Sequence, residues 1–307
     1  MVTPQPLRPG DRIAIISPAT IVDPAYIDGA ARLLAAEGYR PVVMPHAKGP
    51  ASGSFAASDA GRLADLTDAL RDPSVRAILC ARGGYGCNHL LAHVPPALVA
   101  ADPKWLIGFS DVSALHALWQ SAGVVSLHAP MAKHLTLLPA DHYCTRALMR
   151  TLSDGLPAET YSPPHPLDCH GEAEGTLVGG NLAVISGLAS TPFDPLAVCP
   201  GEPLLLFVED ISEAIYAVER MLIRIRLSDG FARVRGIVAG AFTEYRPDRN
   251  HPDMETMIAR LMADLPDIPL ALAFPAGHTD DNMPIPLGAR ARLCVTPDGT
   301  VLASENL

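Results

Sequence analysis

Residues 107–116 read Ile-Gly-Phe-Ser-Asp-Val-Ser-Ala-Leu-His, and this stretch is the starting point for predicting the fold. The apolar run that ends at Phe109 has the length of a buried strand, and Val112 and Leu115 follow at the spacing of a helix face. Ser110 is therefore expected on the turn between a strand and a helix. In α/β folds, a side chain at that place faces the crevice beyond the carboxyl end of the sheet, where ligands bind.

Two interpretations of Ser110 follow from this position. Its hydroxyl would be exposed beside the backbone N–H groups of a helix N-terminus, which can stabilise a developing oxyanion, so Ser110 is a candidate nucleophile. Serine is also a favoured N-cap residue, and Asp111 suits the positive end of the helix dipole, so the same residues fit a purely structural cap. This stretch alone does not separate the two interpretations.

The segments around this stretch alternate between strand patterns and helix patterns. Strands are expected at 12–16, 41–44, 77–80, 105–109 and 124–127, and helices at 24–37 and 59–70. Strands that alternate with helices indicate an α/β fold with a parallel sheet.

A change of composition divides the chain. Residues 156–174 contain several prolines and few periodic apolar positions, so we expect a linker there. It would separate an N-terminal domain (1–155) from a C-terminal domain (175–307). In the second half the patterns predict strands at 204–208 and 236–242, amphipathic helices at 211–225 and 254–265, and a hairpin within 291–303.

Composition and charge exclude several classes of function. The chain has 307 residues with a formal net charge of -10 and no basic cluster, which argues against a nucleic-acid partner. It begins without a basic region followed by an apolar run, and no apolar stretch approaches the ~18 residues of a membrane helix. The six cysteines are scattered without a C-x-x-C pair, which predicts reduced thiols in a cytoplasmic protein.

Metal and cofactor motifs are missing as well. The sequence contains no H-E-x-x-H, no close His/Cys pair with the spacing of a zinc site, and no G-x-x-x-x-G-K-[ST]. We therefore expect no metal and no cofactor.

A glycine-rich segment follows the strand expected at 77–80. Gly83, Gly84 and Gly86 would let the backbone approach a ligand closely. A dinucleotide loop is one interpretation, but its third glycine is missing and this is not the first strand of the fold. A tight turn without a ligand is another. The third is a loop that lines the same crevice as Ser110 and donates an N–H to it.

A nucleophilic serine needs a base and a group that orients the base. Among the 11 histidines, His278 ends an apolar run and precedes a polar loop, although a loop histidine without a catalytic role also fits. Glu209 ends a predicted strand, where a carboxylate is costly to bury unless it is paired, but it would also suit the first turn of a helix. Asp210 and Glu213 compete with Glu209 for a functional role.

Taken in order, several segments resemble the LD-carboxypeptidase family of serine peptidases, which also contains the microcin-immunity peptidases. These segments are Pro9-Gly10-Asp11, Ala81 to Gly86, Gly108 to Asp111, Gly179 to Leu182, Glu209-Asp210, and Gly277-His278 with Asn282 and Pro286-Leu287-Gly288 beyond. The resemblance implies an α/β fold with an N-terminal Rossmann-like parallel-sheet domain that carries the nucleophile. A smaller C-terminal α/β domain would carry the glutamate and the histidine.

By this resemblance Ser110 is the nucleophile, His278 is the general base and then the acid, and Glu209 orients the histidine. The backbone N–H groups of Gly84 and Asp111 would form the oxyanion hole. The implied reaction is hydrolysis of an amide between an L-centre and a C-terminal D-residue, usually the terminal D-alanine of a murein tetrapeptide during cell-wall recycling. The resemblance also implies a cytoplasmic homodimer.

Two alternatives stay open at this point. Within the family, the substrate is instead a peptidyl or aminoacyl adenylate analogue, as for a microcin-immunity peptidase. In another class, the chain is a Rossmann-like ligand-binding module that never forms an acyl-enzyme. One departure from the family pattern is Ala129, which stands where the pattern His-Gly-Pro has glycine; its methyl group is expected to narrow the substrate pocket.

Overall fold

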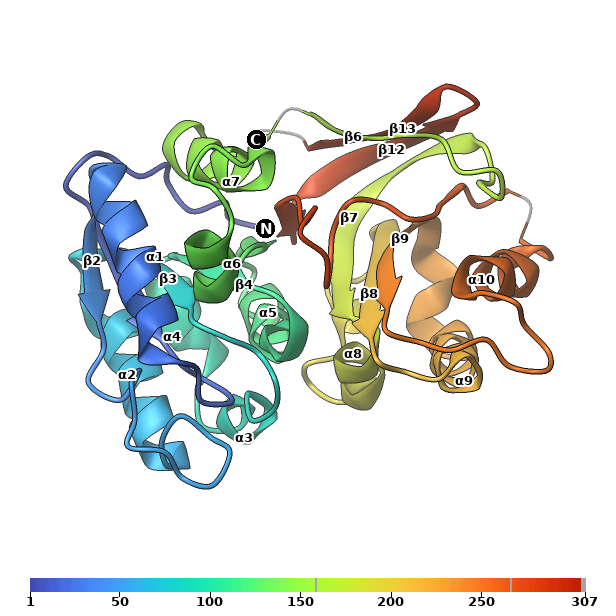
Figure 1. Cartoon of the computed structure of the whole chain (residues 1–307). Coiled ribbons are helices and arrows are strands. Elements are labelled where there is room, and N and C mark those ends of the chain that lie inside the picture. The colour runs from blue at the N-terminus through green and yellow to red at the C-terminus, as the bar shows by residue number, and fades with distance from the viewer. Residues whose placement is uncertain (158, 266, 305–307) are drawn as a thin grey trace. The chain divides into compact units, whose positions relative to one another are not determined.

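The computed structural model describes residues 1–157, 159–265 and 267–304 (Figure 1). The chain divides into two compact units. The first contains Met1–Leu156 and Met283–Pro286, and the second contains Pro157–Asn282 and Leu287–Leu307. The predicted division into domains had instead assigned 175–307 to one continuous C-terminal domain. The return of a short segment to the first unit was not expected, because nothing in the local pattern of residues 283–286 reveals its partner.

The first unit is built on a six-stranded sheet with the order β11-β5-β4-β3-β1-β2. Its strands are β1 (Arg12–Ile16), β2 (Arg40–Val43), β3 (Val75–Cys80), β4 (Trp105–Gly108), β5 (Ser126–His128) and β11 (Ile285–Leu287). Strands β1 to β5 pair in parallel, which confirms the predicted parallel sheet. Their carboxyl ends therefore lie along one edge, and the loops that follow them meet there.

Seven α-helices belong to this unit within the described residues (Figure 1). They are α1 (Pro24–Ala36), α2 (Asp59–Arg71), α3 (Asn88–Leu91), α4 (Pro96–Ala101), α5 (Ser113–Ser121), α6 (Ala132–Leu137) and α7 (Tyr143–Asp154). Side chains cap three of them: Asp23 accepts the N–H of Ala25, Ser58 accepts that of Gly61, and His142 accepts that of Cys144. These caps satisfy N–H groups that have no partner within their own helix.

The second unit contains a mixed seven-stranded sheet with the order β10-β9-β8-β7-β12-β13-β6. Its strands are β6 (Glu159–Ser162), β7 (Gly171–Asn181), β8 (Leu204–Ile211), β9 (Val234–Thr243), β10 (Leu270–Ala271), β12 (Arg290–Thr296) and β13 (Gly299–Ser304). Strands β7 to β10 are parallel, whereas β12, β13 and β6 pair antiparallel. The predicted hairpin is thus confirmed as β12 and β13.

The parallel half of this sheet carries the main apolar core of the second unit. Its helices are α8 (Leu182–Leu188), α9 (Ile215–Arg226) and α10 (Met254–Met262). Figure 1 shows α9 and α10 close to β8 and β9, and buried side chains of all these elements form one cluster. Helix α9 begins four residues later than expected, because Ile211 is still the last residue of β8.

The segment expected to be a linker, 156–174, instead contains ordered strands. Strand β6 pairs with β13 at the edge of the sheet, and the first residues of β7 pair with β12. Between them, the carboxylate of Asp168 accepts the backbone N–H of Leu272 at 2.8 Å. An edge strand of four residues tolerates neighbouring prolines and leaves a weak pattern, so composition alone suggested a linker.

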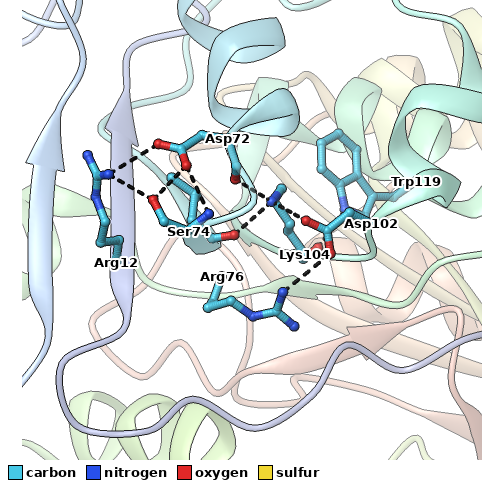
Figure 2. A network of polar contacts seen from close by, with 8 residues as sticks. Arg12, Asp72, Ser74, Arg76, Asp102, Lys104 and Trp119 are labelled. Carbon is cyan, nitrogen blue, oxygen red and sulfur yellow. Dashed lines mark hydrogen bonds and ion pairs between the residues drawn. The ribbon is translucent and has the colours of Figure 1, made fainter.

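A buried lysine joins the amino ends of β3 and β4 (Figure 2). The Lys104 side chain is fully buried, and its Nζ donates to the carbonyl oxygens of Asp72 and Val75 at 2.8 and 2.7 Å. Its third hydrogen bond goes to the carboxylate of Asp102 at 2.7 Å. This cation uses all its donors at the sheet edge opposite the one that carries Ser110.

Within the described residues, no helix combines the length and apolar character needed to cross a membrane.

Candidate active site

Ser110 lies where β4 turns sharply into the short 3₁₀ helix Ser110–Val112 and then into α5. Its φ of 66° lies in the left-handed region, which non-glycine residues rarely adopt. The N-cap position belongs to Phe109, and no side-chain cap hydrogen bond is made there. The capping interpretation of Ser110 is therefore wrong.

The left-handed backbone of Ser110 costs about 1–2 kcal/mol relative to an ordinary conformation. Such strain persists only where the surrounding structure holds it, and it concentrates at functional positions. The side chain of Ser110 is only partly buried. A strained serine on a turn between a strand and a helix has the geometry of a nucleophile elbow.

The glycine-rich loop packs directly against this serine. A Cβ at Gly83 would lie 2.7 Å from Ser110 Cβ and 2.9 Å from its Oγ, so only glycine fits. The next residue, Gly84, has a φ of 104°, and Thr20 Oγ1 would lie 2.3 Å from a Cβ there. Of the three interpretations of this loop, the structure favours the one that places it beside Ser110.

Asp111 anchors the far end of the same loop. Its buried carboxylate accepts the backbone N–H of Cys87 at 2.8 Å. Burial, and then the negative charge of Asp111, raise the pKa of Cys80 and Cys87, so both remain neutral thiols. The sequence suggested a role for the Asp111 backbone, but not this structural role of its side chain.

A buried histidine supports the strand end before Ser110. His116 Nε2 lies 2.8 Å from the carbonyl oxygen of Gly108, and its Nδ1 lies 2.8 Å from Ser126 Oγ. Burial, and then the nearby ring of His128, lower the pKa of His116 from 6.5 to about 3. The ring is therefore neutral near pH 7. Because a carbonyl only accepts, Nε2 carries the proton and Nδ1 accepts from the serine hydroxyl.

The Gly108 carbonyl also accepts the backbone N–H of Ala129 at 3.0 Å. Ala129, which departs from the family pattern, is fully buried at the end of β5. Its methyl group is thus packed within the first unit.

In the second unit, the structure brings Glu209 and His278 together. Glu209 Oε2 lies 2.6 Å from His278 Nδ1, although the two residues are 69 positions apart in the sequence. The Glu209 side chain is 0% exposed and that of His278 is 14% exposed. A carboxylate accepts, so Nδ1 carries the proton and the lone pair of the imidazole lies on Nε2. This is the arrangement of a base and its orienting carboxylate.

Two glycines make room for the Glu209 side chain. A Cβ at Gly277, where φ is 120°, would lie 2.8 Å from Glu209 Oε2. A Cβ at Gly240 would lie 3.2 Å from Glu209 Cβ and 2.4 Å from the carbonyl oxygen of Ala276. The buried Asn282 accepts the N–H of Gly277 at 2.9 Å and holds the loop that carries His278. The need for glycine at position 240 escaped the sequence analysis.

Asp210 has a different role from its neighbour. Because successive strand residues face opposite sides of a sheet, its carboxylate points away from the face that carries Glu209. It accepts from Asn181 Nδ2 at 2.9 Å and from the N–H of Ala183 at 2.8 Å, which ties β8 to the start of α8. Burial raises the pKa of Asp210 to about 6. The side chain of Glu213, the other competitor, is half-buried on the segment between β8 and α9.

The described residues contain no cluster of three or more His, Cys, Asp or Glu side chains that could hold a metal ion.

Comparisons with known proteins place both halves of the chain in one class, the two-domain carboxypeptidases. The family model of the LD-carboxypeptidase N-terminal domain matches residues 13–129, and that of the C-terminal domain matches residues 174–293. The chain belongs to the LD-carboxypeptidase family, which confirms the resemblance drawn from its motifs.

Individual relatives agree with this assignment over nearly their whole length. The probable murein peptide carboxypeptidase of Bacillus subtilis is 32% identical over 297 residues, covering 94% of this chain and 91% of that protein. The crystal structure of a muramoyltetrapeptide carboxypeptidase from Oxalobacter formigenes matches with a TM-score of 0.84 and 30% identity, covering 96% of this chain and 99% of that one. An MccF-like protein from Bacillus anthracis matches with a TM-score of 0.86 and 25% identity over the full length of both chains.

The left-handed backbone at Ser110 predicts an unusual effect of glycine on stability. Ser110→Gly should be more stable than Ser110→Ala by about 0.5–1 kcal/mol, because glycine carries no Cβ penalty at positive φ and loses part of this gain as backbone entropy. Thermal and urea unfolding of both variants measure the difference. A Ser110→Gly variant that is less stable than Ser110→Ala would contradict this account.

Because His116 is buried and neutral, we expect the folded protein to lose stability in acid. Its folded-state pKa lies below that of the unfolded chain, so the unfolded chain binds the extra proton between about pH 6.5 and pH 3. The contribution of His116 to stability is complete above that window and is lost as the pH falls through it, by at most about 1.4 kcal/mol per pH unit. His116→Gln does not titrate and should unfold with a shallower pH dependence. Equal slopes of unfolding free energy against pH in the two proteins would disprove the role of His116.

Proposed function

We propose that the chain is a serine carboxypeptidase that hydrolyses an L,D-amide bond and releases the terminal D-alanine of a murein tetrapeptide. Ser110 is the nucleophile, His278 is the general base and then the acid, and Glu209 orients the imidazole. The observation that carries this proposal is the buried Glu209–His278 pair, whose 2.6 Å contact leaves the lone pair on Nε2. The proposed reaction uses residues from both units.

In the first half of the proposed reaction, Ser110 Oγ attacks the carbonyl carbon of the scissile amide and its proton passes to His278 Nε2. The imidazolium that forms is stabilised by the carboxylate of Glu209. The substrate carbonyl oxygen becomes an oxyanion, which accepts hydrogen bonds from the backbone N–H groups of Gly84 and Asp111. The carbon–nitrogen bond then breaks, and His278 gives its proton to the leaving amine of D-alanine.

The second half returns the enzyme to its starting state. Water enters and His278 removes one of its protons, so that the oxygen attacks the acyl-enzyme carbonyl. The ester bond to Ser110 breaks, and the proton on His278 passes back to the serine oxygen. The products are the shortened peptide and D-alanine.

The substrate class is supported by the family and by the names of its members. The relatives from Bacillus subtilis and Oxalobacter formigenes are named as carboxypeptidases of murein peptides or of muramoyltetrapeptide. The MccF-like relative supports a second candidate, an aminoacyl or peptidyl adenylate analogue cleaved by the same three residues. A cytoplasmic location and a homodimer are also part of this proposal, and both rest on the family resemblance.

The three proposed catalytic residues should act as one unit. Ser110→Ala removes the nucleophile and His278→Ala removes the base, so each should lower turnover on the order of 10³-fold or more. The double variant should be hardly worse than either single one. Glu209→Gln should cost less than Ser110→Ala, because it disturbs the imidazole without deleting a reacting group. Turnover measured together with the thermal midpoint checks these effects, and an active Ser110→Ala variant would rule out the mechanism.

The substrate can be tested directly on the purified protein. We expect release of D-alanine from murein tetrapeptide, little action on an all-L peptide, and unchanged turnover in EDTA. Chromatography of the products, with and without the chelator, measures all three. Intact tetrapeptide together with cleavage of an aminoacyl-sulfamoyl adenosine would favour the second candidate. Loss of activity in EDTA that zinc restores would overturn the serine mechanism.

A further inference from the structure

Arg62 is a buried cation beneath the glycine-rich loop of the first unit. Its side chain lies on α2 and is 0% exposed. Nη1 donates to two backbone carbonyls, that of Pro18 and, at 2.9 Å, that of Gly86. Nη2 donates to Asp59, and the guanidinium lies 4.8 Å from the centre of the Phe55 ring. One side chain therefore holds two backbone segments that are far apart in the sequence.

The two segments held by Arg62 also bind each other. Pro18 follows β1 and leads to Thr20, while Gly86 is the last glycine of the loop after β3. The N–H of Thr20 donates to the Gly83 carbonyl at 3.3 Å, and the N–H of Tyr85 donates to Thr20 Oγ1 at 3.1 Å. These bonds lie on either side of Gly84 in the chain, so Thr20 sets the orientation of the Gly84 peptide group.

The contact between Arg62 and the loop leaves no room for a side chain at position 86. Gly86 has a φ of 130°, and a Cβ there would lie 2.8 Å from Arg62 Nη1 and 3.0 Å from the Phe55 ring. On the other side of the loop, Cys87 is held by Asp111. The loop is thus fixed from below by the guanidinium and at its end by a carboxylate.

We propose that Arg62 is a positioning residue: it clamps the loop 83–86 so that the N–H of Gly84 is directed at the oxyanion of the transition state. This inference rests on the proposed function. Arg62 itself does not touch the substrate; it acts through the Gly86 carbonyl and through Thr20. Arginine suits the task because its planar fork serves two carbonyls and a carboxylate while its face stacks on an aromatic ring, which the compact ammonium of lysine cannot reproduce.

A purely structural role for Arg62 would give a different result from a positioning role. Oxyanion donors work because they are fixed before the reaction, so a displaced Gly84 N–H lowers kcat even in a folded molecule. Lys104 provides the matched control. It is a fully buried cation of the same unit that also donates to backbone carbonyls, but it lies at the amino ends of the strands (Figure 2).

The test measures kcat and KM for D-alanine release from murein tetrapeptide, with kcat expressed per folded molecule. Arg62→Lys should lower kcat about 10- to 100-fold and leave KM within about threefold. Lys104→Met should lose stability and keep the kcat of the original protein. If Arg62→Lys keeps its kcat, or if Lys104→Met loses as much, the positioning role is overturned.

A second pair of variants covers the case in which Arg62→Lys does not fold. Thr20→Val removes the acceptor for the Tyr85 N–H but still fills the space beside Gly84, and should lower kcat to a similar extent. Thr20→Ser keeps the hydroxyl and should retain most of the activity. Equal kcat in these two variants would overturn the inference. Ser110→Ala distinguishes failure of the positioning role from failure of the proposed function. If Ser110→Ala is inactive while the Arg62 and Thr20 variants turn over normally, only the positioning role fails. If Ser110→Ala is active, the proposed function itself fails.

Discussion

The close approach of Gly83 to Ser110 is the constraint on which the first unit depends. A missing Cβ at Gly83 lets the backbone of one loop lie against the serine of the next, and the serine accepts a left-handed backbone to meet it. The neighbouring contacts hold this arrangement from several sides. Asp111 binds the end of the glycine loop, and His116 binds the carbonyl just before the turn. The strained backbone of Ser110 persists because these contacts together hold the turn in place.

In the second unit, the corresponding constraint is the burial of a carboxylate. Glu209 is fully enclosed, and burying an ion without partners would cost several kcal/mol. The contact with His278 offsets this cost, and glycines at positions 240 and 277 allow the backbone to close around the side chain. The neighbouring Asp210 instead accepts a backbone N–H at the start of α8. Two adjacent acids of one strand therefore have separate roles, since they face opposite sides of the sheet.

Local patterns predicted most of the fold. The strand and helix periodicities of the first half match β1 to β5 and helices α1, α2 and α5 closely, because each pattern reports the burial of one element against a sheet. Predictions that needed a distant partner were weaker. Residues 156–174 were expected to be a linker because β6 is a short edge strand among prolines, and its partner β13 is more than 130 residues away in the chain. The capping interpretation of Ser110 was wrong because it rested on residue type, and residue type does not reveal the left-handed backbone that Ser110 adopts.

The sequence alone predicts the strand, turn and helix around Ser110, the glycine loop that precedes it, and the order of motifs that identifies the family. These features are local, and short-range sterics and periodicity specify them. The residues alone left Glu209 and Asp210 in competition, and only the family resemblance implied Glu209; the contact of Glu209 with His278, and those of Arg62 with Gly86 and Pro18, come from the tertiary structure. Those partners are 69, 24 and 44 residues apart, so which side chains meet depends on how the strands are ordered and packed, and no short window of sequence contains that information.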